Sequence, residues 1–592
     1  MNSDEETLRE HGVAYVPGES LVLRLQKSSM AGLNGQMVQG SLLMTTYKLA
    51  FVPPREEGLL LRKGLARPGP RAGARVAHCA FGHLPPDYTQ LPLASIDRVE
   101  RERDRKGSPR VDSDISLYIY SKDVRRLHLL LDSTEDSQRA YKAILAYAFC
   151  KETKHLFAFQ HRLLAPGAGP DKKGQDPGWR VYKSRAEFER MGITAPRPDG
   201  SPSPWRYTEE NRDFRLCGSY PDVMVVPAPV PDEEVRAVAR FRSEQRMPAL
   251  TWGRREDACS IWRSSQPKVG MSGQTCPEDE RMLAVLASMS PLRSLPILDC
   301  RPMANAMANR ATGYGFESSA SYPQCSVEFM GIGNIHVMRE SLARLESVCL
   351  VPDHHRMDAD WGALVEDTKW LSHIRVVLAT AHRTATEAIT RRQPVLVHCS
   401  HGWDRTSQVC ALAQLFLDPF YRTLDGFQVL IEKDWLAFGH PFQLRHAHGV
   451  VKGEKGKDDQ RSPIFLQFLD CVWQLVSKMP WAFEFTPRYL MCIADHVYSC
   501  RFGTLLCNSN QERSQLGLSE LTASLWTYLE LHRERFVSPL YQPGGEAVLL
   551  PPRSALLRGV SLWADYFLRW SPADIGLGLP TAISSRLWSS CP

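Results

Sequence analysis

Two residues in the segment 395–406 have the types and spacing to carry out chemistry together. Cys399 follows an apolar run at 395–397, and Arg405 comes six positions later, past Gly402 and directly before a predicted helix. A strand, a tight glycine loop and a helix N-terminus together form a cradle of backbone N–H groups that binds phosphate oxygens. The spacing therefore predicts a phosphate-binding loop that begins at the cysteine and ends at the arginine.

The same cradle would stabilise a thiolate. A free cysteine has a pKa of about 8.5, and a helix N-terminus with a nearby cation lowers it to roughly 3.5–7.5. We therefore expect Cys399 to be a nucleophile and Arg405 to bind two phosphate oxygens through its planar guanidinium. Asp404 is expected to protonate the departing alkoxide and then to activate water. These roles describe a cysteine-dependent phosphatase.

The bare Cys-x5-Arg spacing has an alternative interpretation. In a chain with 15 cysteines and many arginines, about one such match is expected by chance. Cys399 would then be a buried thiol and Arg405 a surface residue. The preceding strand, Gly402 and the amphipathic helix expected from Thr406 favour the phosphate loop. For His398 two interpretations are equally favoured: it orients this loop by hydrogen bonding, or it is a structural histidine.

Residues 14–150 predict a small β-rich domain. Short apolar or alternating runs read as strands, and Ser133 begins a helix with apolar residues at Tyr141, Ile144, Leu145 and Phe149. The strand-like runs lie at 21–25, 40–45, 48–52, 115–120 and 126–131. We expect a small barrel or bent sheet closed by one helix, with a mobile loop at 64–76 inside it.

A larger α/β domain is expected at 180–571, after a linker at 151–179 and before a disordered tail at 572–592. Strands alternate with helices, which predicts a sheet with flanking helices. The expected strands are 295–299, 327–330 and 394–398, and the expected helices follow Pro302, lie near 338–347 and 370–389, and begin at Thr406. The whole chain is thus expected to be an α+β multidomain protein.

Composition narrows the class of protein. The formal charge of +6 is small for 592 residues, and 43% hydrophobic content is ordinary for a globular protein. The acidic N-terminus does not resemble a secretory signal, and no run of about 18 apolar residues predicts a membrane span. Scattered cysteines without paired spacing indicate free thiols in a reducing compartment and no zinc site.

Beyond the loop, several blocks resemble the myotubularin family of phosphoinositide 3-phosphatases. The loop reads HCSHGWDRT from 398 to 406, and the family's loop differs only by an aspartate at position 401. Further similar blocks are NAMANR at 305–310, GNIHVMRES at 333–341, GFQVLIEKDW at 426–435, PIFLQFLDCVW at 463–473 and FEF at 483–485. The resemblance runs in order from about residue 14 to residue 571.

The resemblance implies a fold and an activity. Residues 14–150 would be a pleckstrin-like PH-GRAM domain that binds lipids or partners, and the region from 180 would be the phosphatase. The substrates would be phosphatidylinositol 3-phosphate and the 3,5-bisphosphate, hydrolysed through a phosphocysteine without a metal or other cofactor. By analogy the substrate-binding residues are Asn309, Asn334, Ile335, Ser400, His401, Gly402, Trp403, Asp404, Arg405 and Arg445.

The resemblance also implies partners and a location. The partners would be phosphoinositide membrane lipids and other myotubularin-family proteins, and not nucleic acid. The location would be cytoplasmic, at the periphery of endosomal or other intracellular membranes. The basic residues around 101–110 are expected either to form a solvated loop or, less favoured, to touch anionic lipid. Lys433 and Asp434 are expected on a solvated helix face.

Three departures from the family pattern leave alternatives open. His401 replaces an acid, Pro441 replaces an arginine that contacts the 5-phosphate, and no coiled coil follows the domain. Arg445 is retained and would partly compensate for Pro441. One alternative function is a catalytically weak or inactive lipid-binding adaptor that regulates active relatives. Another is a protein tyrosine phosphatase, although Trp403 and Asp404 inside the loop favour a lipid substrate.

Overall fold

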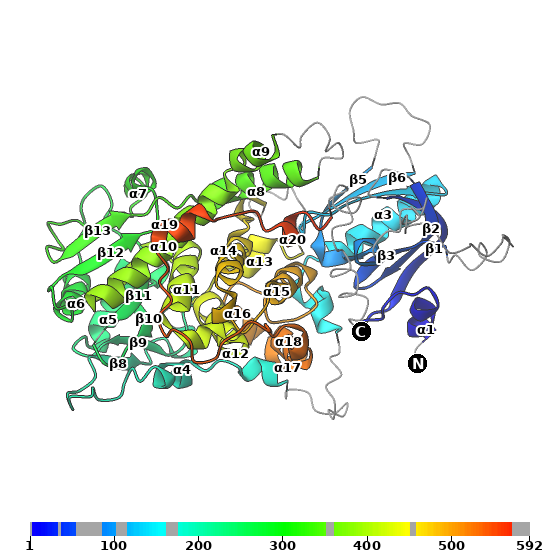
Figure 1. Ribbon diagram of the computed structural model, residues 1–592. Coiled ribbons are helices and arrows are strands. Elements are labelled where there is room, and N and C mark those ends of the chain that lie inside the picture. The colour runs from blue at the N-terminus through cyan, green and yellow to red at the C-terminus, as the bar shows by residue number, and fades with distance from the viewer. Residues whose placement is uncertain are drawn as a thin grey trace, which may run out of the picture.

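The computed structural model describes residues 3–32, 37–54, 86–101, 115–161, 176–257, 259–350, 360–449 and 458–570. Figure 1 shows a β-rich N-terminal part, drawn in blue, beside a larger part in which helices surround a second sheet. The loop expected at 64–76, the tail at 572–592, residues 162–175 of the linker and all but the first of the basic residues near 101–110 lie outside the described residues.

The N-terminal part is a seven-stranded antiparallel sheet with strand order β4-β3-β2-β1-β7-β6-β5. All five expected strands are present. The strands are β1 (Leu21–Ala31), β2 (Met37–Thr45), β3 (Lys48–Val52), β4 (Gln90–Pro92), β5 (Ile96–Arg101), β6 (Ser116–Ser121) and β7 (Arg126–Leu131). The expected helix is α3 (Thr134–Ala148), which the Ser133 side chain caps by accepting a hydrogen bond from the Asp136 N–H. Short helices α1 (Ser3–Glu10) and α2 (Pro86–Thr89) complete this part.

The larger part is organised by a five-stranded sheet with order β10-β11-β14-β12-β13, in which only β10 is antiparallel. Its strands are β10 (Ala249–Gly253), β11 (Ser260–Ser265), β12 (Leu295–Asp299), β13 (Cys325–Phe329) and β14 (Pro394–Cys399). The three strands expected from the sequence are confirmed. A hairpin of β8 (Trp205–Thr208) and β9 (Met224–Pro227) lies beside β10.

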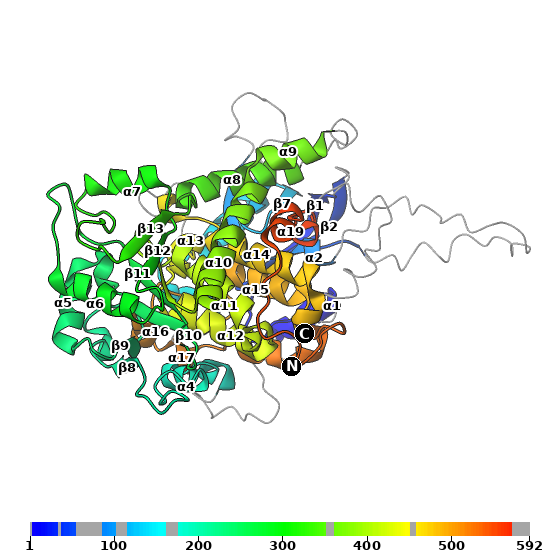
Figure 2. The same cartoon turned by 60° about the vertical axis from the view of Figure 1, so that its left-hand side comes forward.

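Helices cover both faces of this sheet, so its strands are buried throughout. On one face α10 (Trp370–Arg391) and α11 (Arg405–Leu417) pack on Ile261, Val395 and Val397. On the other face α6 (Pro277–Ser288) packs on Trp262 and Leu396. Figure 2 shows α10 and α11 crossing the sheet near the centre of the molecule.

The remaining helices surround this core. Near the sheet lie α4 (Ser184–Arg190), α5 (Asp232–Phe241), α7 (Met303–Arg310), α8 (Ile335–Cys349) and α9 (Trp361–Asp367). The C-terminal region adds α12 (Leu424–Ile431), α13 (Phe442–His446), α14 (Ile464–Lys478), α15 (Pro487–Ser499), α16 (Asn510–Gln515), α17 (Leu518–Leu521), α18 (Leu525–Leu531), α19 (Arg553–Arg558) and α20 (Ala564–Phe567). After α20, Trp570 returns to the first sheet and packs in its hydrophobic core.

The helix that follows the loop is not amphipathic, so that prediction is wrong. All 13 residues of α11 are buried, including Thr406, Ser407, Gln408 and Gln414. The polar side chains are satisfied internally: the Gln408 amide, for example, donates to Gln467 Oε1 at 2.8 Å. A helix buried on every side lies at the centre of the domain.

The prediction for Lys433 and Asp434 is also wrong, because both side chains are fully buried. They lie in a π-helical turn, Glu432–Ala437, that continues α12 and changes which side chains face inward. Lys433 Nζ donates to the Gln414 side chain at 2.6 Å and to the Thr251 carbonyl at 2.9 Å. Asp434 accepts from Thr251 at 2.7 Å.

None of the described helices combines the length and the hydropathy that a membrane crossing requires. The described part of the chain also holds no group of three His, Cys, Asp or Glu side chains arranged to bind a metal ion.

Candidate active site

The predicted loop lies at the carboxyl end of the central strand. β14 runs between β11 and β12, parallel to both, and ends at Cys399, while α11 begins at Arg405. The carboxyl ends of parallel strands are where α/β folds place their ligand sites. The residues between the strand and the helix therefore face the N-terminus of α11.

Gly402 has a conformation that other residues rarely adopt. Its φ is +74°, and a Cβ atom built on it would lie 2.3 Å from the Ser264 carbonyl oxygen. Both the positive φ and the contact with β11 require glycine here. The peptide is thereby turned so that the Gly402 N–H donates to Cys399 Sγ at 3.3 Å.

Two buried arginines hold the other end of the turned peptide. The Gly402 carbonyl accepts from Arg246 Nη2 at 2.8 Å and from Arg263 Nη2 at 2.9 Å. Both side chains are fully buried. Arg263 is held in turn by Asp434, with Nη1–Oδ1 at 2.9 Å. The loop carbonyl therefore points into the protein, and its N–H groups are left for the nucleophile and an anion.

Cys399 is placed where a thiolate is favoured. Only 2% of the residue is exposed, and burial alone would raise the pKa of its thiol. The Arg405 guanidinium, the Thr406 hydroxyl and the Thr406 N–H outweigh burial and lower the pKa below its ordinary value. The alternative of Cys399 as an inert buried thiol does not account for this set of donors.

Arg405 and Ser400 link the loop to its surroundings. Arg405 Nη2 donates to Ser400 Oγ and Nη1 donates to the Ile332 carbonyl, each at 3.3 Å. Ser400 Oγ also lies 3.4 Å from the donating Asn309 Nδ2, whose stronger contact is Gln266 Oε1 at 2.9 Å. Arg405 is 8% exposed, so it is not the surface residue of the alternative interpretation.

Asp404 is held by two bases on a neighbouring segment. Arg445 donates to both of its oxygens, Nε to Oδ1 at 3.1 Å and Nη2 to Oδ2 at 2.8 Å, and His440 Nδ1 lies 3.1 Å from Oδ1. Burial would raise the pKa of the Asp404 carboxyl, but Arg445 and then His440 hold it far below its usual range. The carboxyl is therefore ionised in the free protein.

His401 and Trp403 form the aromatic side of the loop. Their rings stack with centroids 4.7 Å apart and planes 23° from parallel. Burial lowers the pKa of His401, so the ring is neutral at neutral pH. The resemblance implies a carboxylate at this position, whereas this chain presents an uncharged aromatic ring.

Asn334 and Ile335 lie at the start of α8, near Arg405. The Asn334 side chain caps the helix by accepting from the N–H groups of His336 and Val337, both at 3.1 Å. The Ile335 carbonyl accepts from the Ser462 hydroxyl at 2.9 Å. Among the described residues, neither of these two forms a hydrogen bond with Cys399.

His398 anchors the strand through a fully buried charge network. Its Nε2 lies 3.1 Å from Glu317 Oε2, and Glu317 also accepts from Arg242 at 2.6 Å. Arg242 donates to both oxygens of Asp279 at 2.8 and 2.6 Å. Burial lowers the pKa of His398, but Glu317 outweighs this and raises it. Glu317 therefore favours the protonated form of His398 and pairs its charge directly behind Cys399.

Several important residues were not predicted from the sequence. They are Arg242, Arg246, Arg263, Gln266, Glu317 and His440. One signal was present: the apolar run of β11 is interrupted by Arg263 and ends in the polar residues Ser264, Ser265 and Gln266. A polar end on a buried strand indicates a site. The partners of Arg246 and Glu317 come from distant segments and leave no local pattern.

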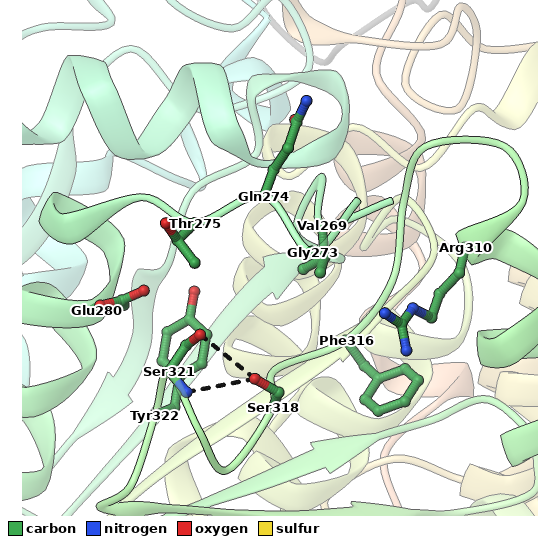
Figure 3. A pocket seen from close by; sticks show the side chains of 10 residues that line it. All are labelled: Val269, Gly273, Gln274, Thr275, Glu280, Arg310, Phe316, Ser318, Ser321 and Tyr322. Atoms are coloured by element: carbon green, nitrogen blue, oxygen red, sulfur yellow. Dashed lines mark hydrogen bonds between the residues drawn. The ribbon is translucent and has the colours of Figure 1, made fainter. Parts of the chain in front are cut away.

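A cavity of about 90 Å³ lies beside the site but does not include it. Figure 3 shows its lining between the end of α7 and the start of α6, with Arg310 above the Phe316 ring and Glu280 opposite. No residue of 399–405 lines this cavity.

Comparisons with known proteins agree with the geometry. Residues 156–514, more than half of the chain, match the family described as "Myotubularin-like phosphatase domain". This match defines a phosphatase domain, with the Cys-x5-Arg loop at the carboxyl end of its central strand.

The phosphatidylinositol-3,5-bisphosphate 3-phosphatase MTMR2 of Bos taurus is 42% identical over 500 residues, which are 82% of this chain and 72% of that protein. Myotubularin of Xenopus tropicalis is 38% identical over 561 residues, 95% of this chain and 85% of its own. Myotubularin of Rattus norvegicus is 39% identical over 483 residues, 81% of this chain and 76% of its own. The chain belongs to the myotubularin family.

The loop geometry predicts that Gly402→Ala is severely disruptive. The new Cβ would meet the Ser264 carbonyl, so the turned peptide and its N–H contact to Cys399 would be lost. We expect a loss of about 1–3 kcal/mol in the free energy of unfolding by urea and loss of inorganic phosphate binding by calorimetry. Gly544→Ala is the control, since Gly544 has φ +78° but open space around it. Equal effects of the two changes would contradict the role of the close contact.

The lowered pKa of Cys399 predicts an unusual pH dependence of alkylation. Only the thiolate reacts, and below the ordinary pKa the thiolate fraction of Cys399 exceeds that of an unperturbed cysteine. Its alkylation by iodoacetamide, followed by peptide mass spectrometry, should therefore persist at neutral pH. Arg405→Met removes the main stabilising charge and should move the midpoint of alkylation to higher pH. An unchanged midpoint would show that Arg405 does not stabilise the thiolate.

Proposed function

We propose that this chain is a phosphatidylinositol 3-phosphate 3-phosphatase that acts through a phosphocysteine intermediate. The observation that carries the proposal is the placement of Cys399 Sγ next to the Gly402 N–H, at the N-terminus of α11, with Arg405 alongside. A thiolate in a cradle of donors can attack phosphorus while the same donors bind the non-bridging phosphate oxygens.

The reaction would proceed in two steps. Cys399 Sγ attacks the 3-phosphate, an S–P bond forms and the P–O bond to the inositol breaks, while Asp404 gives its proton to the departing alkoxide. Water then attacks the phosphocysteine, Asp404 takes a proton from that water, and the S–P bond breaks to release inorganic phosphate. Arg405 would bind two phosphate oxygens through both steps.

This mechanism requires Asp404 to gain a proton when substrate binds. In the free protein Arg445 and His440 keep the carboxyl ionised. A bound phosphate dianion would place like charge beside Asp404 and compete for Arg445, and both effects raise the pKa of a carboxyl. The substrate would thus weaken the Asp404–Arg445 pair enough for Asp404 to gain a proton, while Arg445 stays beside the carboxyl and orients it.

The family relationship and the surface of the site favour a membrane lipid as substrate. The general acid lies inside the loop, as the resemblance implies, and the named relatives include phosphoinositide 3-phosphatases. Exposed apolar side chains also flank the site, as detailed below. Pro441 offers no charge for a 5-phosphate, and Arg445 is engaged with Asp404. We therefore propose the 3-monophosphate as the preferred substrate over the 3,5-bisphosphate.

The proposal extends to the rest of the chain. The β-rich part would be a PH-GRAM domain that binds lipids or partners, and the protein would act at the periphery of endosomal or other intracellular membranes. Other myotubularin-family proteins are proposed as partners. Residues 14–150 and 180–571 remain the proposed domain limits, with Asn309, Asn334 and Ile335 as substrate contacts beside the loop.

A second function has one observation in its favour. Turnover would be lowered by the bidentate ion pair of Arg445 with Asp404 and by the neutral His401, which stands in the place of an acid. The chain would then be a catalytically weak or inactive lipid-binding adaptor that regulates active relatives. Retention of Cys399 and Arg405 argues against this second function.

Phosphate release from purified protein distinguishes these functions. The substrates are vesicles with phosphatidylinositol 3-phosphate, vesicles with the 3,5-bisphosphate, and a phosphotyrosine peptide, each assayed beside Cys399→Ser. We expect release from the monophosphate to exceed that from the bisphosphate, and the peptide to stay at background. Release from no substrate above the Cys399→Ser level would favour the adaptor. Release from the peptide alone would exclude a lipid phosphatase.

The apolar side chains that flank the site form a rim, defined as Met271, Met303, Met307 and Val337, which are 76, 58, 47 and 40% exposed. Met303 and Met307 lie one turn apart on α7, the helix that also carries Asn309. Arg310 Nε donates to the carbonyl of Gly270, which places Met271 beside the end of this helix. Val337 is in the first turn of α8. A rim of this kind suits insertion into a lipid interface.

The rim predicts a difference between lipid and soluble substrates for the double variant Met303→Gln/Met307→Gln. Apolar burial contributes about 25 cal/mol per Å². Loss of two methionine side chains from the lipid interface should therefore lower turnover of vesicle-bound substrate by about tenfold. Hydrolysis of soluble inositol 1,3-bisphosphate should not change. Leu292→Gln is the matched control, because Leu292 is also 58% exposed but precedes β12, at the amino ends of the parallel strands and opposite the loop. A parallel fall on both substrates would contradict membrane insertion.

A further inference from the structure

The helix that carries Arg445 ends against the β-rich part of the molecule. This helix, α13, has only five residues and stops at Ala447, which has a left-handed φ of +50°. Carbonyl groups at a helix C-terminus lack partners within the helix. The Ala447 carbonyl accepts instead from Lys122 Nζ, at 2.9 Å. The contact joins residues that are 325 positions apart in the chain.

Lys122 is well fixed on its own side. It lies between β6 and β7, its backbone N–H donates to the Ser95 carbonyl at 2.8 Å, and its ammonium also donates to the Ala94 carbonyl at 2.8 Å. The residue is 7% exposed. Burial, and then the charge of Arg461, lower the pKa of Lys122 to about 8, so the ammonium form remains the main one at neutral pH. The lysine therefore connects two carbonyls, one from each part.

A second contact connects the same two parts on the other side of Arg445. Asp97 at the start of β5 forms an ion pair with Arg461. The next residue, Ser462, donates its N–H to the Arg445 carbonyl at 3.0 Å, and the Gln460 carbonyl accepts from Arg445 Nη1 at 2.9 Å. Both chain segments that position Arg445 are thus tied to the β-rich part.

From these contacts we propose that Lys122 is a positioning residue, which holds Arg445 against Asp404 from the β-rich part and so sets the proton transfer by Asp404. The proposal rests on the proposed function, in which Asp404 is the general acid. Arg445 contacts both Asp404 oxygens, so a displacement of α13 moves the partner that decides how the carboxyl points. A misplacement of about 1 Å at a reacting group can cost roughly 100-fold in rate.

A comparison of two leaving groups tests this role. Inositol 1,3-bisphosphate leaves as an alkoxide and needs a proton from Asp404, whereas p-nitrophenyl phosphate leaves as a stable phenolate and needs little help. For Lys122→Met in the full chain we expect kcat for the inositol phosphate to fall about tenfold, while kcat for the aryl phosphate stays within about twofold. Both substrates are measured on one sample, so a partly unfolded preparation would lower both equally.

Two further variants support the comparison. Lys48→Met is the matched control, because Lys48 is a 4% exposed lysine of the same sheet that donates to the Ala14 carbonyl within its own part. Its ratio of the two kcat values should equal that of the unaltered protein. Asp97→Asn removes the second contact and should shift the ratio in the same direction as Lys122→Met.

The effect of Lys122→Met is also measured in the Asp404→Asn variant, which lacks the acid. If Lys122 acts only through the acid, adding Lys122→Met to Asp404→Asn should cause no further fall with the inositol phosphate. An additive fall, or a parallel fall on both substrates in Lys122→Met alone, would overturn the role of Lys122 and leave the proposed function intact. No hydrolysis of the inositol phosphate by the unaltered protein would overturn both.

Discussion

The active-site loop depends on the way the Gly402 peptide is held. Its carbonyl is bound by two fully buried guanidinium groups, Arg246 and Arg263, and its N–H is thereby presented to Cys399. A buried carbonyl with two charged donors is strongly oriented, because hydrogen bonds to charged groups are worth about 1.5–3 kcal/mol each. The backbone of the loop is consequently shaped before an anion arrives.

This orientation is supported from deep in the domain. Arg263 is held by Asp434, which lies in the π-helical turn next to the buried Lys433. On the other side of β14, His398 and Glu317 continue to the Arg242–Asp279 pair. Buried charges are costly unless they are paired and hydrogen-bonded. Here the pairing is close to complete, so the cost is offset while the net positive charge remains at the loop.

Positive charge around the loop acts on two groups in different ways. It lowers the pKa of Cys399 and makes the nucleophile ready, but through Arg445 it also keeps Asp404 ionised. In the proposed mechanism, Cys399 is prepared in the free protein, and Asp404 becomes an acid only when phosphate binds. The helix that carries Arg445 is in turn connected to the first sheet through Lys122. Chemistry at the loop is thus coupled to the arrangement of the two parts.

The sequence by itself determined the elements and the order of the chemical groups. Apolar runs predicted β12, β13 and β14, and Ser133 marked the start of α3, because periodicity and capping are local properties. The spacing of Cys399, Gly402 and Arg405 indicated the phosphate loop for the same reason: neighbouring residues must form it.

Only the tertiary structure decided what surrounds this loop. The α-helical period predicted that Lys433 and Asp434 would be exposed to solvent. The π-helical turn instead directs both side chains into the protein. α11 looked amphipathic because it contains polar residues. These residues are nevertheless buried, because they find hydrogen-bond partners on α14 and other distant segments. Arg246, Glu317 and Lys122 gave no local signal, since their partners Gly402, His398 and Ala447 lie 81 to 325 positions away in the chain. Interactions between residues so far apart are set by packing, which a local pattern does not contain.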